Sequence, residues 1–183
     1  AFGWREPQSS AEPLVLDALG TGDLVHLVLD RALRDLETGE GLASADAVTI
    51  EAAIARAAQS VAADWESERP VPPPVIWSRT LDDARVLAGR ALAYGDDVHP
   101  GTRSYGEVPF GGSEPKSEAE TPWDPNAPVA IPETGFNIAG YIDRLDISGD
   151  GKRALVRDYK TGRPPRGEIR LNGGRELQRC LYA

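Results

Sequence analysis

Two aspartates and a lysine in the second half of the chain have the types and spacing of a cation site. Asp143 lies in one strand-like run, and Asp158 and Lys160 lie in the next. If a tight turn joins the two runs, the carboxylates face each other with their Cβ atoms about 4.5 to 5.5 Å apart. Like charges in that position repel, so Lys160 or a divalent cation has to compensate.

The neighbours of these carboxylates favour one of two interpretations. An Asp-x-Lys pattern on a strand is also typical of a solvated sheet edge. Leu145 and Val156 are expected on the same face, which favours a partly buried site where unpaired charge is costly. Oxygen ligands suit Mg²⁺ or Mn²⁺ better than soft metals. A turn one residue longer would place the carboxylates diagonally and loosen the pair.

Strands are predicted in the second half of the chain. The runs Phe136–Ile147 and Arg153–Tyr159 flank the turn Ser148–Lys152, which predicts a hairpin. A further strand is predicted over Arg103–Phe110. Residues 111–134 are rich in Gly, Pro and Glu, and we expect a flexible loop or an insertion there.

Helices are predicted in the first half of the chain. Apolar residues recur at spacings of three and four over residues 22–37 and about 49–66, and a third helix is predicted over Thr80–Tyr94. The Pro-rich stretch that begins at Pro70 is expected to separate the second helix from the third. A last helix is expected from Gly173 onward.

Composition limits the classes of protein that fit. The chain has 183 residues, one cysteine and a net charge of −9, which excludes a disulfide framework or a cysteine-rich metal site within it. We expect a reducing, cytoplasmic location and no membrane association, because no apolar run reaches spanning length. The charge is segregated: residues 151–183 hold nine Lys and Arg against three Asp and Glu, although the chain as a whole is acidic.

Four short motifs occur in order along the chain. They are Gly22-Asp-Leu-Val-His26, Gly140-Tyr-Ile-Asp143-Arg-Leu-Asp, Asp158-Tyr-Lys160-Thr-Gly and Gln178-Arg-Cys-Leu-Tyr182. Together they resemble the PD-(D/E)XK nuclease superfamily, and most of all the RecB-like nuclease domain of bacterial helicase-nucleases of the AddB type. The resemblance implies a restriction-endonuclease-like α/β fold, in which helices flank a mixed central sheet. We expect a single domain over residues 1–183 that is a piece of a longer protein.

The same resemblance implies roles for individual residues. Asp143 and Asp158 would be carboxylate ligands of Mg²⁺ or Mn²⁺, and His26 a further ligand from the first helix. Lys160 would position or activate the attacking water. Glu107 stands on a predicted strand where related domains often carry a glutamate near the site. Without the resemblance, a histidine on an amphipathic helix is more simply a structural residue.

The basic C-terminal segment is the expected DNA-binding part. Gln178 and Tyr182 are four residues apart, so they share one helix face, and in the family this motif contacts DNA and braces the site. Tyr182 fits an ordinary core position equally well. The expected contacts to backbone phosphates are the arginines of this segment: Arg163, Arg166 and Arg175, together with Arg170 and Arg179.

The resulting hypothesis is a metal-dependent DNA nuclease of exonuclease type that acts in recombination and repair. Its expected partners are DNA, as single strands or ends, and a helicase domain or subunit. No iron-sulfur cluster is expected within this chain, because residues 1–25 contain no cysteine. Two alternatives remain: a catalytically inactive nuclease fold that binds DNA or serves as a scaffold, and an acidic protein-interaction domain unrelated to DNA.

Overall fold

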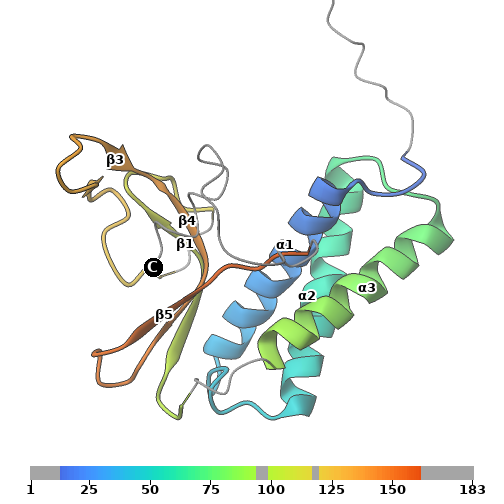
Figure 1. Cartoon of the computed structure of the whole chain (residues 1–183). Coiled ribbons are helices and arrows are strands. Elements are labelled where there is room, and N and C mark those ends of the chain that lie inside the picture. The colour runs from blue at the N-terminus through green and yellow to red at the C-terminus, as the bar shows by residue number, and fades with distance from the viewer. Residues whose placement is uncertain (1–12, 94–98, 117–119, 162–183) are drawn as a thin grey trace, which may run out of the picture.

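Three helices form a layer beside a small sheet in the computed structural model, which describes residues 13–93, 99–116 and 120–161 (Figure 1). They are α1 (Ala18–Glu37), α2 (Ala47–Glu68) and α3 (Pro74–Ala93). Helix α1 contacts both other helices and strand β1 (Arg103–Phe110), so it lies between these two helices and the sheet. None of the described helices is long and apolar enough to span a bilayer.

Helices α1 and α2 form where the apolar periodicity predicts them, although α1 begins at Ala18, four residues before the predicted start. Asp17 and Asp46 cap α1 and α2, because each side chain accepts a hydrogen bond from a backbone N–H of the first turn. The helical core combines Leu, Val and Ile with many small residues, which allow close packing. Its fully buried members include Leu24, Val28, Ala32, Ala53, Val61 and Ala88.

The prediction for the third helix was wrong at its start. The helix was expected from Thr80, after the prolines, but α3 begins at Pro74. A proline is tolerated in the first turn, where its missing N–H would have no helical acceptor anyway. The first turn then places Trp77 in the core, where it lies 5% exposed and donates to Glu66 Oε1 over 2.6 Å.

The main sheet has the strand order β1-β4-β5 and every pair among the described strands is antiparallel. Strand β4 spans Gly140–Ile147 and β5 spans Ala154–Arg157, whereas β2 (Val129–Ala130) and β3 (Asn137–Ile138) form a separate short pair. Helices on an antiparallel sheet agree with the expected restriction-endonuclease-like α/β fold. No parallel strand, which the expected mixed sheet requires, occurs among the described residues.

The predicted strand over residues 136–147 is interrupted at Ala139. There the chain passes so close to Gly111 that a Cβ on that glycine would lie 2.0 Å from Ile138 O. Only glycine permits this close approach. On either side of Ala139 the chain belongs to different ladders, since β3 pairs with β2 and β4 pairs with β1. The preceding segment contains β2 and several turns among its described residues.

The hairpin register agrees with the prediction as far as β5 extends. Leu145 pairs with Val156 and Arg144 with Arg157, and Ser148 N–H donates to Arg153 O across the turn. β5 ends at Arg157, one residue before Asp158. The predicted pair of Asp143 and Asp158 therefore falls just beyond the last ladder pair, where the Tyr159 N–H donates to Asp143 Oδ2.

Strands β1 and β4 place a second carboxylate opposite Asp143. Gly106 pairs with Arg144 and Val108 with Ile142, so Glu107 faces Asp143 between these pairs. Glu107 has φ 47°, a left-handed conformation that costs a residue with a side chain about 1 to 2 kcal/mol. The surrounding ladder holds Glu107 in this strained conformation.

A buried ionic group ties the strands of the sheet together. The Arg144 side chain is fully buried and its Nε donates to Asp146 Oδ1 over 2.7 Å, while Arg157 Nε donates to Asp146 Oδ2 over 2.9 Å. Ser104 Oγ donates to the same Asp146 Oδ1. One carboxylate is thus shared by two guanidinium groups and connects β1, β4 and β5.

The strained backbone at residue 107 predicts an unusual order of stability. Without metal, Glu107→Gly should be more stable than Glu107→Ala by about 1 kcal/mol, because both remove the carboxylate but only glycine relieves the left-handed strain. Urea denaturation in a chelator measures the difference. In the control pair, Arg103→Gly should be less stable than Arg103→Ala, since Arg103 has ordinary strand geometry. The same order at both positions would contradict the strain at Glu107.

The ionic group predicts a large loss of stability when its acid is neutralised. Asp146→Asn should lower the free energy of unfolding by about 3 kcal/mol or more, because two buried or half-buried guanidinium groups lose their counter-charge. Asp83→Asn is the matched control, since Asp83 pairs with Arg79 on the exposed face of α3 and should change stability by less than about 0.5 kcal/mol. Equal effects of the two substitutions in urea denaturation would refute the proposed role of Asp146.

Candidate metal centre

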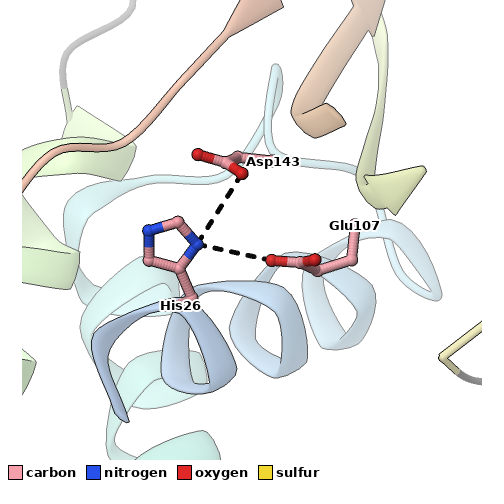
Figure 2. A group of neighbouring side chains, drawn as sticks. All are labelled: His26, Glu107 and Asp143. Atoms are coloured by element: carbon pink, nitrogen blue, oxygen red, sulfur yellow. Dashed lines mark hydrogen bonds and ion pairs between the residues drawn. The ribbon is translucent and has the colours of Figure 1, made fainter. Parts of the chain in front are cut away.

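The imidazole of His26 lies between helix α1 and the two facing carboxylates (Figure 2). Its Nδ1 is 3.4 Å from Glu107 Oε1 and 3.7 Å from Asp143 Oδ1. On the other side of the ring, Nε2 lies 3.1 Å from the backbone oxygen of Tyr159. Helix α1 can approach the sheet closely here because Gly106 has no side chain: a Cβ would lie 2.6 Å from Asp30 Oδ1.

The contact with Tyr159 decides which nitrogen of His26 carries a proton. A carbonyl oxygen only accepts hydrogen bonds, so Nε2 must donate and therefore keeps its proton. In the neutral ring, Nδ1 then presents its lone pair to the carboxylates. A backbone carbonyl that fixes the tautomer in this way is typical of metal-binding histidines.

The second oxygen of each carboxylate is held by a donor. Asp143 Oδ2 accepts from the backbone N–H of Tyr159 over 2.7 Å, and Glu107 Oε2 accepts from Lys116 Nζ over 2.5 Å. The remaining oxygens, Asp143 Oδ1 and Glu107 Oε1, face His26 Nδ1. The backbone N–H and C=O of Tyr159 thus orient the aspartate and the histidine, respectively.

The charges of the three groups depend on one another. The hydrogen bond to Glu107 is the largest effect on the pKa of His26 and raises it. Burial lowers this pKa, but the hydrogen bond together with a smaller contribution from the Asp143 charge outweighs burial. Burial alone would raise the pKa of Glu107, but hydrogen bonds from His26 and Lys116 lower it. Burial raises the pKa of Asp143. A positive charge between the carboxylates, whether a proton on His26 or a cation, therefore stabilises the group.

The donor set fits a divalent cation. One ligand atom each from His26, Glu107 and Asp143 lies within 4.8 Å of the others, which is the convergence that a shared ion requires. One imidazole nitrogen with two carboxylate oxygens suits Mg²⁺ or Mn²⁺, and these ions keep further positions for water.

Asp158 and Lys160 lie beside this group. Lys160 Nζ donates to Asp158 Oδ1 over 2.8 Å, and the lysine side chain is half exposed. Asp158 is not one of the three converging ligands, but its charge contributes to the raised pKa of Asp143. The structure therefore brings Asp143 together with His26 and Glu107, while Asp158 lies beside the three converging groups.

Two contributors to the site carry no sequence signal. Lys116 belongs to a segment that was expected to be a loop or an insertion, and its contact with Glu107 depends on how that segment folds back. Tyr159 acts through its backbone, which residue type does not reveal. Several predicted residues lie outside the described part of the chain: Arg163, Arg166, Arg170, Arg175, Gln178, Arg179 and Tyr182.

The chain matches one family model along nearly its whole length. The model of the PD-(D/E)XK nuclease superfamily covers residues 4–183, which include His26, Glu107 and Asp143. Searches of curated proteins and of solved structures give no significant match. Members of the superfamily are generally nucleases, and they typically use divalent metals. The converging ligands agree with that chemistry, and the extent of the match shows that the chain belongs to the PD-(D/E)XK nuclease superfamily.

Proposed function

We propose that this chain is a Mg²⁺- or Mn²⁺-dependent DNA nuclease of exonuclease type. The observation that carries the proposal is the convergence of His26 Nδ1, Glu107 Oε1 and Asp143 Oδ1 in a chain of this superfamily. The hydrogen bond to the Tyr159 carbonyl keeps a proton on Nε2 of His26. The lone pair of Nδ1 is therefore available to a cation, and this nitrogen does not serve a structural hydrogen bond alone.

Each residue of the site has a part in the proposed hydrolysis. His26, Glu107 and Asp143 would hold the ion, with Asp158 as a further carboxylate ligand. A divalent ion supplies Lewis-acid polarisation of the phosphoryl oxygen and lowers the pKa of water. Lys160, half exposed next to Asp158, would orient the attacking water and offset the negative charge that develops on the phosphate.

The biological setting is part of the same proposal. The ordered motifs from Gly22 to Tyr182 favour a RecB-like branch of the superfamily, which acts with a helicase in recombination and repair in the cytoplasm. DNA single strands or ends are the proposed substrate. Within this branch the chain would be the nuclease part of a larger helicase-nuclease.

Metal binding should compete with the proton on His26. The pKa of His26 is raised, so its stabilising charge is present below about pH 6.5 and is lost as the pH rises through the raised pKa. Mn²⁺ should therefore bind more tightly as the pH rises through this range, by up to about tenfold per unit, and then level off. Isothermal titration calorimetry at several pH values measures this, and His26→Gln should abolish the pH dependence.

Two aspartate variants test the ligand set itself. Asp143→Asn should weaken Mn²⁺ binding by about tenfold or more, because it removes a charged ligand but keeps the shape. Asp150→Asn on the exposed hairpin turn is the matched control and should leave affinity unchanged. Equal affinities of Asp143→Asn and the parent chain, or pH-independent binding, would show that the ion is held elsewhere.

Removal of the site lysine should separate catalysis from metal binding. Lys160→Ala should lower the cleavage rate of a labelled single-stranded DNA by about 100-fold or more in Mg²⁺ or Mn²⁺, and change Mn²⁺ affinity by less than about threefold. Lys152→Ala in the hairpin turn is the matched control, since it removes the same charge at a distance from the site. Gel electrophoresis of the products measures the rate.

Two outcomes would overturn parts of the proposal. Full activity of Lys160→Ala would remove the lysine from the mechanism. Salt-sensitive DNA binding with no cleavage in either metal would favour the alternative, a catalytically inactive nuclease fold that binds DNA or serves as a scaffold.

A further inference from the structure

A cleft of about 720 Å³ extends along α1 on both sides of the candidate metal centre. It is lined by α1 residues between Ala18 and Arg34, by Arg69 after α2, by Glu107 and Lys116, and by the segment 159–161. His26 stands between its two ends on α1. The cleft is therefore continuous with the proposed ion site.

The charge of this cleft differs from that of the chain. Five cationic side chains line it against three acidic ones, although the whole chain has a net charge of −9. The cationic residues are Arg31, Arg34, Arg69, Lys116 and Lys160, and the acidic ones are Asp23, Asp30 and Glu107. A concentration of positive charge in an acidic protein attracts an anionic ligand locally.

The cationic residues lie toward both ends of the cleft. Helices α1 and α2 run antiparallel, since Arg31 contacts Asp64 and Asp35 contacts Arg56, so Arg69 lies toward the start of α1. Thr161 lies near Gly22, at the same end. Gly22 and Arg34 are about 18 Å apart at the helical rise of 1.5 Å per residue, with His26 between them. An extended polyanion along α1 would thus meet cations before and after the metal centre.

Two of these arginines are free to exchange their partners. Arg31 donates to Ser60 and Asp64 at the surface, and Arg69 stacks over Trp65 with its side chain about half exposed. A surface ion pair contributes about 0 to 1 kcal/mol, so a phosphate can replace the carboxylate at low cost. Arg34 differs, because it is the partner of the buried Asp30.

The residues of the cleft favour contacts to a backbone over contacts to bases. Among the described residues that line the cleft, the aromatic side chains are those of His26 and Tyr159. The Tyr159 hydroxyl is buried. Base stacking needs exposed rings, whereas phosphates need accessible cations. The described residues that line the cleft offer accessible cations and not exposed rings.

We infer that the cleft along α1 is a track for the backbone of single-stranded DNA, with Arg31 and Arg69 contacting phosphates on opposite sides of the cleavage site. The inference rests on the proposed nuclease function and extends it to a binding surface on the helical half of the chain. The track is additional to the arginines expected between residues 163 and 179.

The test compares two double variants of the whole chain. Arg31→Gln/Arg69→Gln removes the track, and Arg79→Gln/Arg85→Gln removes two ion-paired arginines from α3 outside the cleft. Fluorescence anisotropy with a labelled 20-nucleotide thymidine strand in Ca²⁺ measures affinity at several salt concentrations. The track variant should bind about tenfold more weakly at low salt, and its slope of log affinity against log salt should be smaller by about 1.4, because two phosphate contacts are lost. The control should remain within twofold of the parent chain.

Unfolding and cleavage complete the test. Both variants should unfold at a temperature close to that of the parent chain, and the track variant should cleave with a raised KM and a nearly unchanged kcat. An unchanged affinity and slope in the track variant, or an equal loss in the control, would overturn the track even if the parent chain cleaves DNA. If the parent chain fails to cleave but the track variant shows the predicted loss of slope, the track stands and the proposed hydrolysis falls.

Discussion

Two carboxylates face each other where β1 and β4 pair, and the arrangement of the site follows from their repulsion. Glu107 and Asp143 are largely buried, so their charges are poorly screened and need a cation between them. Two groups of the protein offset part of this negative charge. They are His26, whose pKa is raised, and the Lys116 ammonium at the outer oxygen of Glu107. A divalent ion would neutralise both carboxylates at once, which is the physical reason to expect a metal centre at this place.

The backbone of Tyr159 links this site to the rigid part of the sheet. Its N–H holds Asp143 and its C=O holds His26, so a small displacement of this segment would misplace two ligands together. The segment follows directly on β5, which the buried group of Arg144, Asp146 and Arg157 connects to the rest of the sheet. Stability and function are therefore coupled: the ionic group stabilises the fold and also determines where the ligands lie.

Local patterns in the sequence predicted most of the elements but only part of the site. Strand β1 and the hairpin register follow from alternation and turn residues, and both agree with the structure. The start of α3 was predicted wrongly because a proline in the sequence indicates the interruption of a helix. Only the structure shows that this proline lies in the first turn, where it is tolerated. The resemblance placed Glu107 near the site, but its position opposite Asp143 depends on the β1–β4 register and a left-handed backbone, which only the folded sheet provides. The cationic cleft depends on how α1 packs against α2, so the sequence pointed only to the basic C-terminal segment.

The most direct test of the account is anomalous diffraction from a crystal soaked in Mn²⁺. The account predicts one strong peak between α1, β1 and β4, within about 2.0 to 2.6 Å of His26 Nδ1 and of one oxygen each from Glu107 and Asp143. A peak bound by other residues, or a His26 ring whose Nδ1 points away from the ion, would contradict it.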